Sequence, residues 1–360
     1  MMALRPVLIM AGGTGGHVFP ALAVADELRT RGVPVVWLGT QAGIEARLVP
    51  QAGYPIEWLS IKGLRGMNFL SQLLIPLRLI LACTQAASIL RRRKPCAVLG
   101  MGGFASGPGG FMAWLMRRPL LIHEQNAVAG LTNRLLAKLT RHRLEAFPGA
   151  LGKHAEHIGN PVRRDIIAIT DPEQRLAMHT TAMRVLVVGG SLGAVRLNQV
   201  IPEALAKMPD EIRPEVHHQT GLNNLEAARD LYRKHGVEAR VDAFIDDMAA
   251  AYAWADLVVC RAGAMTVFEL AAAGVASILI PYPYAVDDHQ TANAAYLVAQ
   301  GAALMRQQNK LNSDWLCEQL TQFSEHRERL MEMACAARAQ AKPEAARVVA
   351  DRCMAAGGLS

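Results

Sequence analysis

The sequence of 360 residues is poor in aromatic and charged side chains: Phe, Trp and Tyr make up 5% of it, and Asp, Glu, Lys and Arg 19%. Disordered chains have a low apolar content, whereas 51% of these residues are hydrophobic, so general disorder is excluded. Because aromatic residues are scarce, the core must consist mainly of Leu, Ile, Val, Ala and Met. The length leaves room for two ordinary domains.

The sequence also lacks the signatures of metal binding, secretion and membrane spanning. Its six cysteines include no C-x-x-C pair and have no histidine at ligand spacing, which argues against a zinc site and against a disulfide framework. The first 16 residues end in glycines and not in a cleavage site, so we expect no secretory signal. In segment 68–94, polar residues and Pro76 interrupt every apolar run before the ~20 residues that a bilayer span requires. We therefore expect a cytoplasmic protein with free thiols and no metal.

Two common nucleotide motifs are missing as well. The first glycine cluster is not G-x-G-x-x-G, because Val18 stands where the third glycine would be. The second expected strand ends in Trp37, Leu38, Gly39 and Thr40, without a carboxylate for a ribose. No Gly-Lys-Ser/Thr follows the cluster, which excludes a P-loop. A dehydrogenase is thus disfavoured, and we expect no cofactor.

Charge is distributed unevenly along the chain. Residues 1–165 hold 20 Lys and Arg against 8 Asp and Glu, whereas the remainder holds 18 against 23. A basic half indicates a polyanion, a membrane surface or a phosphorylated ligand as partner. Nucleic acid is the weaker choice, because the basic half has no aromatic RNA-binding strand and no zinc-finger spacing. We expect no nucleic-acid partner.

Short aliphatic runs alternate with longer helical patterns, as in α/β proteins with parallel sheets. Each half opens with an apolar strand that runs into a glycine cluster and a helix, VLIMAGGTGGHVFPALAVADEL first and VLVVGGSLGAVRLNQVIPEAL second. Two such units predict two Rossmann-like domains. The expected strands are 6–10, 34–38, 56–59, 97–100 and 120–123 in the first half, and 184–188, 215–219, 240–244, 257–260 and 277–281 in the second.

The domain boundary is expected where Asn160-Pro161 interrupts regular structure. We assign residues 1–164, the basic half, to an N-terminal domain that meets a membrane surface or a phosphorylated ligand, and residues 165–341 to a C-terminal domain. Residues 342–360 are expected to form a helix that packs back on the N-terminal domain.

Three glycine-rich stretches follow expected strands: 12–16, 100–110 and 189–193. Glycine lets the backbone turn sharply and approach a ligand, and the amides at the start of the next helix face an anion. A tight turn without a ligand remains the alternative for any one of them. Three together predict a cleft for a large phosphate-bearing substrate.

Two further segments follow expected strands in the second half. Residues 260–274, CRAGAMTVFELAAAG, lead into a helix that should begin near Ala264 or Met265, with Glu269 one turn inside it. Residues Asp287 to Gln290 concentrate donors and acceptors, and a polar turn is their alternative interpretation.

The motifs GGTGGHVFPALAVA, GMGGFASGPGG, HEQN, GNPVR, GGSLGA, FIDDM, CRAGAMTVFE and DDHQ, in this order, closely resemble the MurG family. The resemblance covers about residues 10–293 and implies a GT-B type α/β fold, two Rossmann-like domains whose parallel sheets face a cleft. It implies an inverting N-acetylglucosaminyltransferase of peptidoglycan synthesis. The donor would be UDP-N-acetylglucosamine, and the acceptor the C4 hydroxyl of undecaprenyl-diphospho-muramoylpentapeptide. The implied location is peripheral, at the cytoplasmic face of the inner membrane, where cell-wall synthesis proteins are further candidate partners.

The resemblance also implies roles for individual residues. Ile245 would contact the uracil, Arg163 the nucleotide end, and Glu269 the ribose hydroxyls. The diphosphate would be held by Ser191 and by the first turn of the helix formed by Ala264, Met265, Thr266, Val267 and Phe268. Phe268 departs from the family, which usually has a small residue there. The sugar would contact Gln290, Asn126, Thr14, Gly15 and Gly16. Helix amides can stabilise the departing UDP without a metal, so we expect no essential divalent ion.

An inverting transfer needs a base for the acceptor hydroxyl. His17 is the first candidate, because it lies at a helix amino end, where the dipole disfavours a positive charge. A structural histidine is the alternative, and Glu124 is the second candidate base. Two rival functions remain: a UDP-N-acetylglucosamine epimerase of the same fold, and a non-catalytic, membrane-associated nucleotide-binding protein. Segment 68–94, with basic residues around its apolar runs, is expected to bind an anionic membrane, or alternatively to form a core helix.

Overall fold

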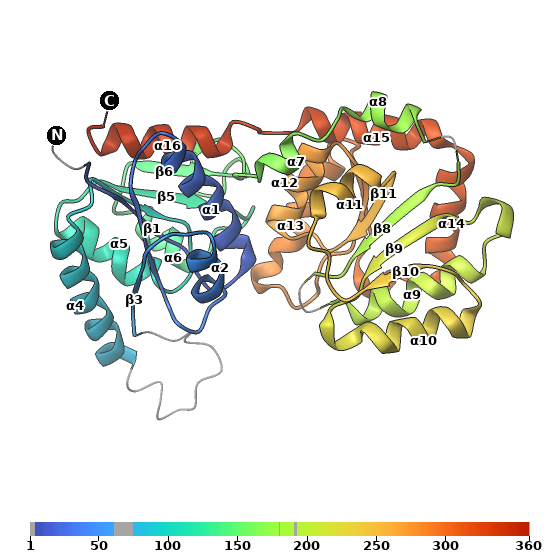
Figure 1. Cartoon of the computed structure of the whole chain (residues 1–360), viewed down its shortest axis with the longest axis horizontal. Coiled ribbons are helices and arrows are strands. Elements are labelled where there is room, and N and C mark those ends of the chain that lie inside the picture. Colours follow the sequence, from blue (N-terminus) through green and yellow to red (C-terminus); the bar gives the residue numbers. More distant parts are fainter. Residues whose placement is uncertain (1–3, 61–74, 180, 191–192, 360) are drawn as a thin grey trace. The chain divides into compact units, whose positions relative to one another are not determined.

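The computed structural model describes residues 4–60, 75–179, 181–190 and 193–359. They form two compact units, Met1–Arg163 with Lys342–Ser360, and Arg164–Ala341. Each unit contains one parallel sheet with helices on its faces (Figure 1). The residues outside this description include Ser191 and residues 61–74, and with them the first part of segment 68–94.

The sheet of the first unit has seven parallel strands in the order β3-β2-β1-β4-β5-β6-β7. Val7 of β1 pairs with Val35 on one side and with Ala97 on the other, which centres the sheet on β1 and β4. The central strands are buried on both faces, as expected for a parallel sheet. The strands are β1 Val7–Met10, β2 Val35–Gly39, β3 Ile56–Trp58, β4 Ala97–Gly100, β5 Leu120–Glu124, β6 His142–Glu145 and β7 Glu156–His157.

Helices cover both faces of this sheet. Val7 and Ile9 of β1 point into a core formed with the helices α1 and α16, whereas Leu8 and Met10 point into a core formed with α4 and α5. The α16 helix comes from the end of the chain and lies beside α1 (Figure 1). The helices are α1 Gly15–Thr30, α2 Glu45–Gln51, α4 Ile75–Arg93, α5 Ser106–Leu115, α6 Leu131–Leu136 and α16 Ala345–Ala356.

The second unit has six parallel strands in the order β10-β9-β8-β11-β12-β13. Its strands are β8 Arg184–Val188, β9 Glu215–Gln219, β10 Arg240–Asp242, β11 Leu257–Cys260, β12 Ala276–Leu279 and β13 Ala303–Met305. Val185 and Val187 of β8 pack with α9, α10 and α14 in one apolar core. The helices are α7 Arg164–Ile167, α8 Pro172–Ala177, α9 Val195–Ala206, α10 Leu225–His235, α11 Met248–Trp254, α12 Ala264–Ala273, α13 His289–Val298, α14 Ser313–Glu325 and α15 Arg327–Ala339.

The predicted α/β class with two Rossmann-like parallel sheets is confirmed, and all ten expected strands are present within two residues of their expected ends. Three further strands, β6, β7 and β13, were not expected from the sequence; they are short and lie near the sheet edges. β6 and β7 carry polar residues, so they lack the apolar run on which the prediction relied.

The α4 helix bears out the core alternative for the last part of segment 68–94. The second half of the helix packs on the core, with Ala86, Ile89 and Leu90 buried. Its first half exposes apolar side chains, with Leu77 at 64% and Ile80 at 61% accessibility. Within the described part of the chain, no helix has both the length and the apolar character needed to cross a membrane.

Candidate active site

Both sheets place their glycine loops at equivalent points. In the first sheet, the strand order runs from β1 through β2 to β3 on one side, and from β4 to β7 on the other. The strands β8 and β11 divide the second sheet in the same way. Ligands of open α/β sheets bind beyond the carboxyl ends of the two strands at such a switch point. The loops after β1 and β4, and those after β8 and β11, occupy these positions.

In the first unit, the two glycine loops pack against each other through their backbones. Gly103 adopts φ +84°, and a Cβ atom there would lie 2.5 Å from the carbonyl oxygen of Gly12. The oxygen of the buried Ser106 hydroxyl lies within hydrogen-bond distance of two carbonyl oxygens, that of Met10 at 2.9 Å and that of Gly102 at 2.7 Å. Side chains at these positions would push the two loops apart, which explains why the sequence has glycine there.

Glu45 supports the first glycine loop, a role that the sequence analysis missed. Its buried carboxylate accepts hydrogen bonds from the Gly13 amide at 2.9 Å, and from the Thr40 amide and hydroxyl at 3.0 and 2.7 Å. The bonded residues lie up to 32 positions apart, so no local motif could have indicated the contact.

His17 lies in the first turn of α1, and its tautomer follows from its contact. Its Nδ1 is 3.1 Å from the carbonyl oxygen of Gly12. A carbonyl can only accept, so in the neutral ring Nδ1 carries the hydrogen and Nε2 has the lone pair. Gly102, with φ +94°, gives room to the ring, because a Cβ atom there would lie 2.8 Å from Nε2. A half-buried imidazole in this state can accept a proton through Nε2.

Glu124, at the end of β5, is surrounded by donors of the protein. Only 2% exposed, it accepts from the amide of Asn126 at 2.9 Å, from the amide of Gly130 at 3.1 Å, and from Asn133 Nδ2 at 2.9 Å. Both of its oxygens are therefore engaged in holding the loop after β5. These contacts favour an anchoring role for Glu124, so His17 is the stronger candidate base.

The HEQN and GNPVR segments are bonded to each other. The fully buried His123 contacts the carbonyl oxygen of Gly159 through Nε2 at 3.0 Å, and Asn160 Nδ2 donates to the carbonyl oxygen of Gln125 at 3.0 Å. Burial lowers the pKa of His123 to about 4, so the ring is neutral at pH 7. The half-buried Asn126 follows Gln125 directly, and Arg163 is the last residue before the second unit.

In the second unit, Gln219 supports the glycine loop after β8. Its Oε1 accepts from the Gly190 amide at 3.0 Å, and its Nε2 donates to the carbonyl oxygens of Gly190 and Ala243. Gly193 adopts φ +75°, and a Cβ atom there would lie 2.1 Å from the carbonyl oxygen of Thr220. Only glycine fits this position, which explains why the GGSLGA motif has a glycine at residue 193.

The α12 helix begins at Ala264, as predicted, with Gly263 as its N-cap. The first bond within the helix runs from the Val267 amide to the carbonyl oxygen of Gly263, so the amides of Ala264, Met265 and Thr266 precede the helical ladder. Val267 and Phe268 are buried, and Phe268 stacks on Tyr296 with ring centroids 5.5 Å apart. The side chain of Phe268 therefore packs in the core of the second unit.

Glu269 is half-buried on α12, and the Tyr252 hydroxyl donates to its Oε2 at 3.2 Å. Tyr252 lies on α11 and is 1% exposed, so its position is set by the core. The sequence analysis did not identify Tyr252, since an isolated tyrosine in an alanine-rich helix carries no signal.

Ile245 lies in the connection between β10 and α11 and lines a cavity of about 640 Å³. The exposed ring of Phe244 lines the same cavity, together with Asp246, Asp247 and Trp254. A hollow with an aromatic ring and carboxylates beside it is compatible with a planar, hydrogen-bonding group such as a nucleobase.

Gln290, in the first turn of α13, uses its Oε1 to accept from the Tyr282 amide at 2.9 Å. Its NH2 group is thus the end of this side chain that can donate to a ligand. Asp287 and Asp288 precede it with φ +51° and +49°. Two adjacent non-glycine residues in the left-handed region are strained, and such strain concentrates at functional sites.

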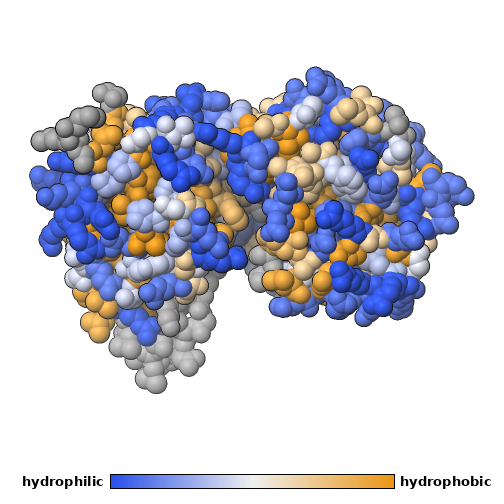
Figure 2. Space-filling model, viewed as in Figure 1, coloured by the Kyte–Doolittle hydropathy of each residue, from blue (hydrophilic) through white to orange (hydrophobic). Residues whose placement is uncertain are grey.

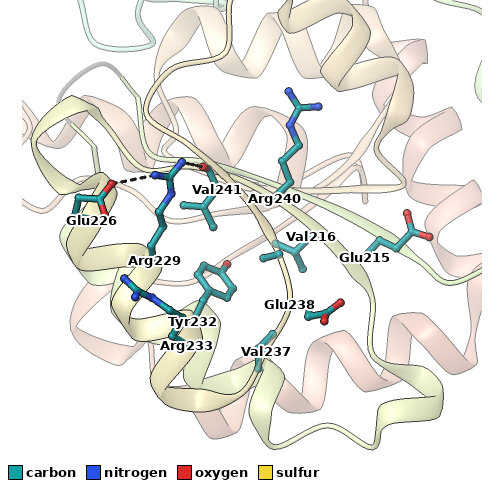
Figure 3. Close-up of a pocket in the computed structure, with 11 residues that line it drawn as sticks. Glu215, Val216, Glu226, Arg229, Tyr232, Arg233, Val237, Glu238, Arg240 and Val241 are labelled. Carbon is teal, nitrogen blue, oxygen red and sulfur yellow. Dashed lines mark hydrogen bonds and ion pairs between the residues drawn. The ribbon is translucent and has the colours of Figure 1, made fainter.

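A cavity of about 870 Å³ lies away from these loops, between α10 and the strands β9 and β10 (Figure 3). Arg229 crosses it, paired with Glu226 and bonded to the carbonyl oxygen of Val241. No group of three His, Cys, Asp or Glu side chains among the described residues could hold a metal ion.

Two parallel sheets of this strand order, each with a glycine loop and a helix amino end at its switch point, are those of a GT-B type glycosyltransferase. Residues 7–143 match the glycosyltransferase family 28 N-terminal domain, and residues 184–349 match the glycosyltransferase family 28 C-terminal domain.

A protein of Nitrosococcus oceani named UDP-N-acetylglucosamine–N-acetylmuramyl-(pentapeptide) pyrophosphoryl-undecaprenol N-acetylglucosamine transferase is 55% identical, over 98% of this chain and 99% of its own. The crystal structure of Acinetobacter baumannii MurG matches with a TM-score of 0.86 and 41% identity, over 98% of this chain and 99% of that one. The chain belongs to the MurG family of N-acetylglucosaminyltransferases.

One rival function shares only the fold. A UDP-GlcNAc 2-epimerase from Neisseria meningitidis, with UDP-GlcNAc bound, matches with a TM-score of 0.64 over 96% of this chain and 98% of that one. Its sequence identity is 14%, so this likeness concerns the architecture alone.

Proposed function

We propose that the protein transfers N-acetylglucosamine from UDP-N-acetylglucosamine to the C4 hydroxyl of undecaprenyl-diphospho-muramoylpentapeptide, with inversion at the anomeric carbon. The observation that carries this proposal is the close relationship to MurG proteins over nearly the whole chain. The glycine loops and helix amino ends at both switch points support it, because they suit a substrate with phosphate groups.

In this proposal the second unit holds the donor. Glu269 accepts hydrogen bonds from the ribose hydroxyls, and the amides at the start of α12 bind the diphosphate together with Ser191. Ile245 presents its backbone to the uracil, and Arg163 contacts the nucleotide end. Val267 and Phe268 contribute through their backbone, because their side chains are buried. Gln290, Asn126 and the loop Thr14, Gly15 and Gly16 contact the sugar.

His17 is the proposed base. Its Nε2 takes the proton from the C4 hydroxyl, whose oxygen attacks the anomeric carbon while the bond from that carbon to the UDP oxygen breaks. The electron pair of that bond leaves with UDP, and the helix amides stabilise the added negative charge. The Gly12 carbonyl holds the imidazole in the tautomer that this step needs.

We also place the protein at the cytoplasmic face of the inner membrane, held there peripherally through the first unit. The supporting surface is formed by exposed apolar side chains on α4, α5 and α6, including Leu77, Ile80, Trp114, Leu115 and Leu131. Its part over the first half of α4 is visible at the lower left of Figure 2. Groups of exposed apolar side chains mark interaction sites on proteins or membranes.

Basic residues border this surface. Arg117 and Arg118 follow α5, and Arg134 and Lys138 line a cavity of about 230 Å³ beside α6. Apolar side chains bordered by cations are typical of proteins that lie on anionic headgroups. A lipid-linked acceptor makes such contact useful, because its diphosphate lies at the headgroup plane.

The proposal is tested by supplying labelled UDP-N-acetylglucosamine with and without the polyprenyl-linked acceptor. Label transferred to the lipid supports it. Epimerisation of the donor without acceptor would indicate the rival enzyme, and absence of both products would indicate a non-catalytic nucleotide-binding protein.

A further inference from the structure

The carboxyl end of α12 is held by two arginine side chains from other helices. The last four carbonyl groups of a helix have no partner within it. In α12, the backbone amides of Val275 and Gly274 satisfy those of Leu270 and Ala271. The Ala272 carbonyl accepts from Arg338 of α15, and the Ala273 carbonyl accepts from Arg175 of α8 at 2.8 Å.

Arg175 is almost completely buried, at 3% accessibility. Its guanidinium donates to the carbonyl oxygens of Ala273, of Gly274 at 2.6 Å and of Thr170 at 3.2 Å. Burial, followed by the charge of Arg338, lowers the pKa of Arg175 to about 10, so the group stays charged at pH 7. A buried charge held by backbone carbonyls and repelled by a second cation is costly. These contacts indicate that Arg175 holds the carboxyl end of α12 in position.

The same two arginines hold the segment that enters the unit. Arg338 donates to the carbonyl oxygen of Ile169, and its guanidinium lies 3.1 Å from Asp171. The chain enters this unit at Arg164 and leaves it after Ala341, three residues beyond Arg338. Gly274, with φ +60°, lets the first residue of α8 approach, because a Cβ atom there would lie 2.7 Å from Pro172.

We propose that Arg175 and Arg338 are positioning residues that join the carboxyl end of α12 to both segments through which the chain enters and leaves the second unit. The α12 helix has ten residues and is therefore about 15 Å long. Diphosphate bound at its amino end is then coupled along a rigid helix to residues 164–177 and to the end of α15. The inference rests on the proposed function, in which the amino end of α12 binds the diphosphate of UDP.

The test replaces Arg175 by lysine in the full-length protein, which keeps the charge and removes the fork that reaches several carbonyls at once. UDP affinity is measured by calorimetry, which does not depend on catalysis. Mutations along a network that couples two sites alter the coupling free energy by an amount that corresponds to an about 2- to 30-fold change in affinity. We therefore expect R175K to weaken UDP binding by that factor. Hydrogen exchange with and without UDP should show protection of residues 164–177 in the wild type and its loss in R175K.

Arg327→Lys is the matched control, because Arg327 also lies on α15 but donates to the buried Asp256 at 2.7 Å and to the carbonyl oxygen of Thr181 instead of a carbonyl of α12. It should lower the unfolding temperature and leave UDP affinity unchanged. The inference is overturned if R175K binds UDP within twofold of the wild type, or if UDP protects only the start of α12. It also fails, together with the proposed function, if the wild type does not bind UDP. Arg338→Lys repeats the test should R175K not fold.

Discussion

At the scale of single residues, three carboxylates near the glycine loops differ in what surrounds them. Glu45 and Glu124 are buried, and their oxygens accept from amides and side chains of the protein. Glu269 is only half-buried, at the switch point of its sheet. This difference separates two anchors, whose removal should cost stability, from a carboxylate whose removal should cost donor binding.

Glu269→Ala should raise the KM for UDP-N-acetylglucosamine by ~10- to 150-fold, because a hydrogen bond to a charged group is worth about 1.5 to 3 kcal/mol. Tyr252→Phe should have a smaller effect, since it removes one hydrogen bond to the carboxylate and leaves the carboxylate itself in place. Steady-state kinetics with varied donor and varied acceptor provide the measurement. An unchanged donor KM in a folded Glu269→Ala variant would contradict the ribose assignment.

His17→Ala should lower kcat by ~100- to 10,000-fold while UDP affinity stays nearly intact, because a base acts on the acceptor proton. Glu124→Gln is the comparison: an amide nitrogen would face donors where an oxygen now accepts, so this variant should unfold at a lower temperature. If kcat of His17→Ala falls less than ~10-fold, the histidine is structural, and Glu124 becomes the candidate to test.

At the scale of elements, the carboxyl ends of strands hold polar groups that tie neighbouring loops together. His123 at the end of β5 and His218 near the end of β9 are both buried, and burial lowers the pKa of each, to about 4 and about 3. Both rings contribute to the fold in their neutral form, one bonded to Gly159 and the other to Tyr232 and Asn198.

Stability should therefore fall as the pH is lowered from about 6.5 toward 4. In this window the histidines of the unfolded state, with an ordinary pKa of about 6.5, bind protons that the folded state does not accept. The free energy of unfolding therefore falls by about 1.4 kcal/mol per pH unit for each group. Urea unfolding between pH 7.5 and 4.5 measures the slope. His218→Gln should flatten it, whereas replacement of the exposed His154 should leave it unchanged. An equal slope in both variants would contradict the prediction.

The helices α4 and α5 carry the proposed membrane surface. Replacing Leu77, Ile80 and Trp114 by serine should abolish binding to anionic vesicles with little loss of stability, because these side chains are largely exposed. Binding of the unchanged protein should weaken with salt, since each basic residue near the surface adds about 1 kcal/mol. Sedimentation with vesicles is the measurement. Serine at Leu222 and Met178, exposed in the second unit, is the control and should leave binding intact.

At the scale of the whole molecule, the chain forms two units with separate cores, and the first is completed by the end of the chain. Val349, Ala350 and Cys353 of α16 lie in the same core as the strands of the first unit. The second unit is formed by one continuous segment that carries most of the proposed donor contacts.

UDP without acceptor should accordingly stabilise the second unit. A ligand at 100 times its dissociation constant stabilises the state that binds it by ~2.7 kcal/mol. We expect hydrogen exchange to slow chiefly at residues 164–341, and the matching thermal transition to shift upward. Protection concentrated in residues 4–60 would contradict the assignment of the donor to the second unit.

Local sequence patterns determined the central strands, the glycine turns and the start of α12. An apolar run such as 184–188 can be satisfied only inside a sheet, and a glycine at φ +75°, as at Gly193, is required by the backbone itself. These properties belong to residues and their immediate neighbours, so a single sequence reveals them.

Contacts between distant segments were decided only by the tertiary structure. Glu45 became the support of Gly13, Phe268 turned into the core against Tyr296, and Arg175 reached the carboxyl end of α12, 98 residues away at Ala273. The half-burial of α4 has the same origin, since its periodicity does not specify which part is covered by α5. Partners of buried polar groups depend on which surfaces meet when the chain packs, and no local pattern encodes that meeting.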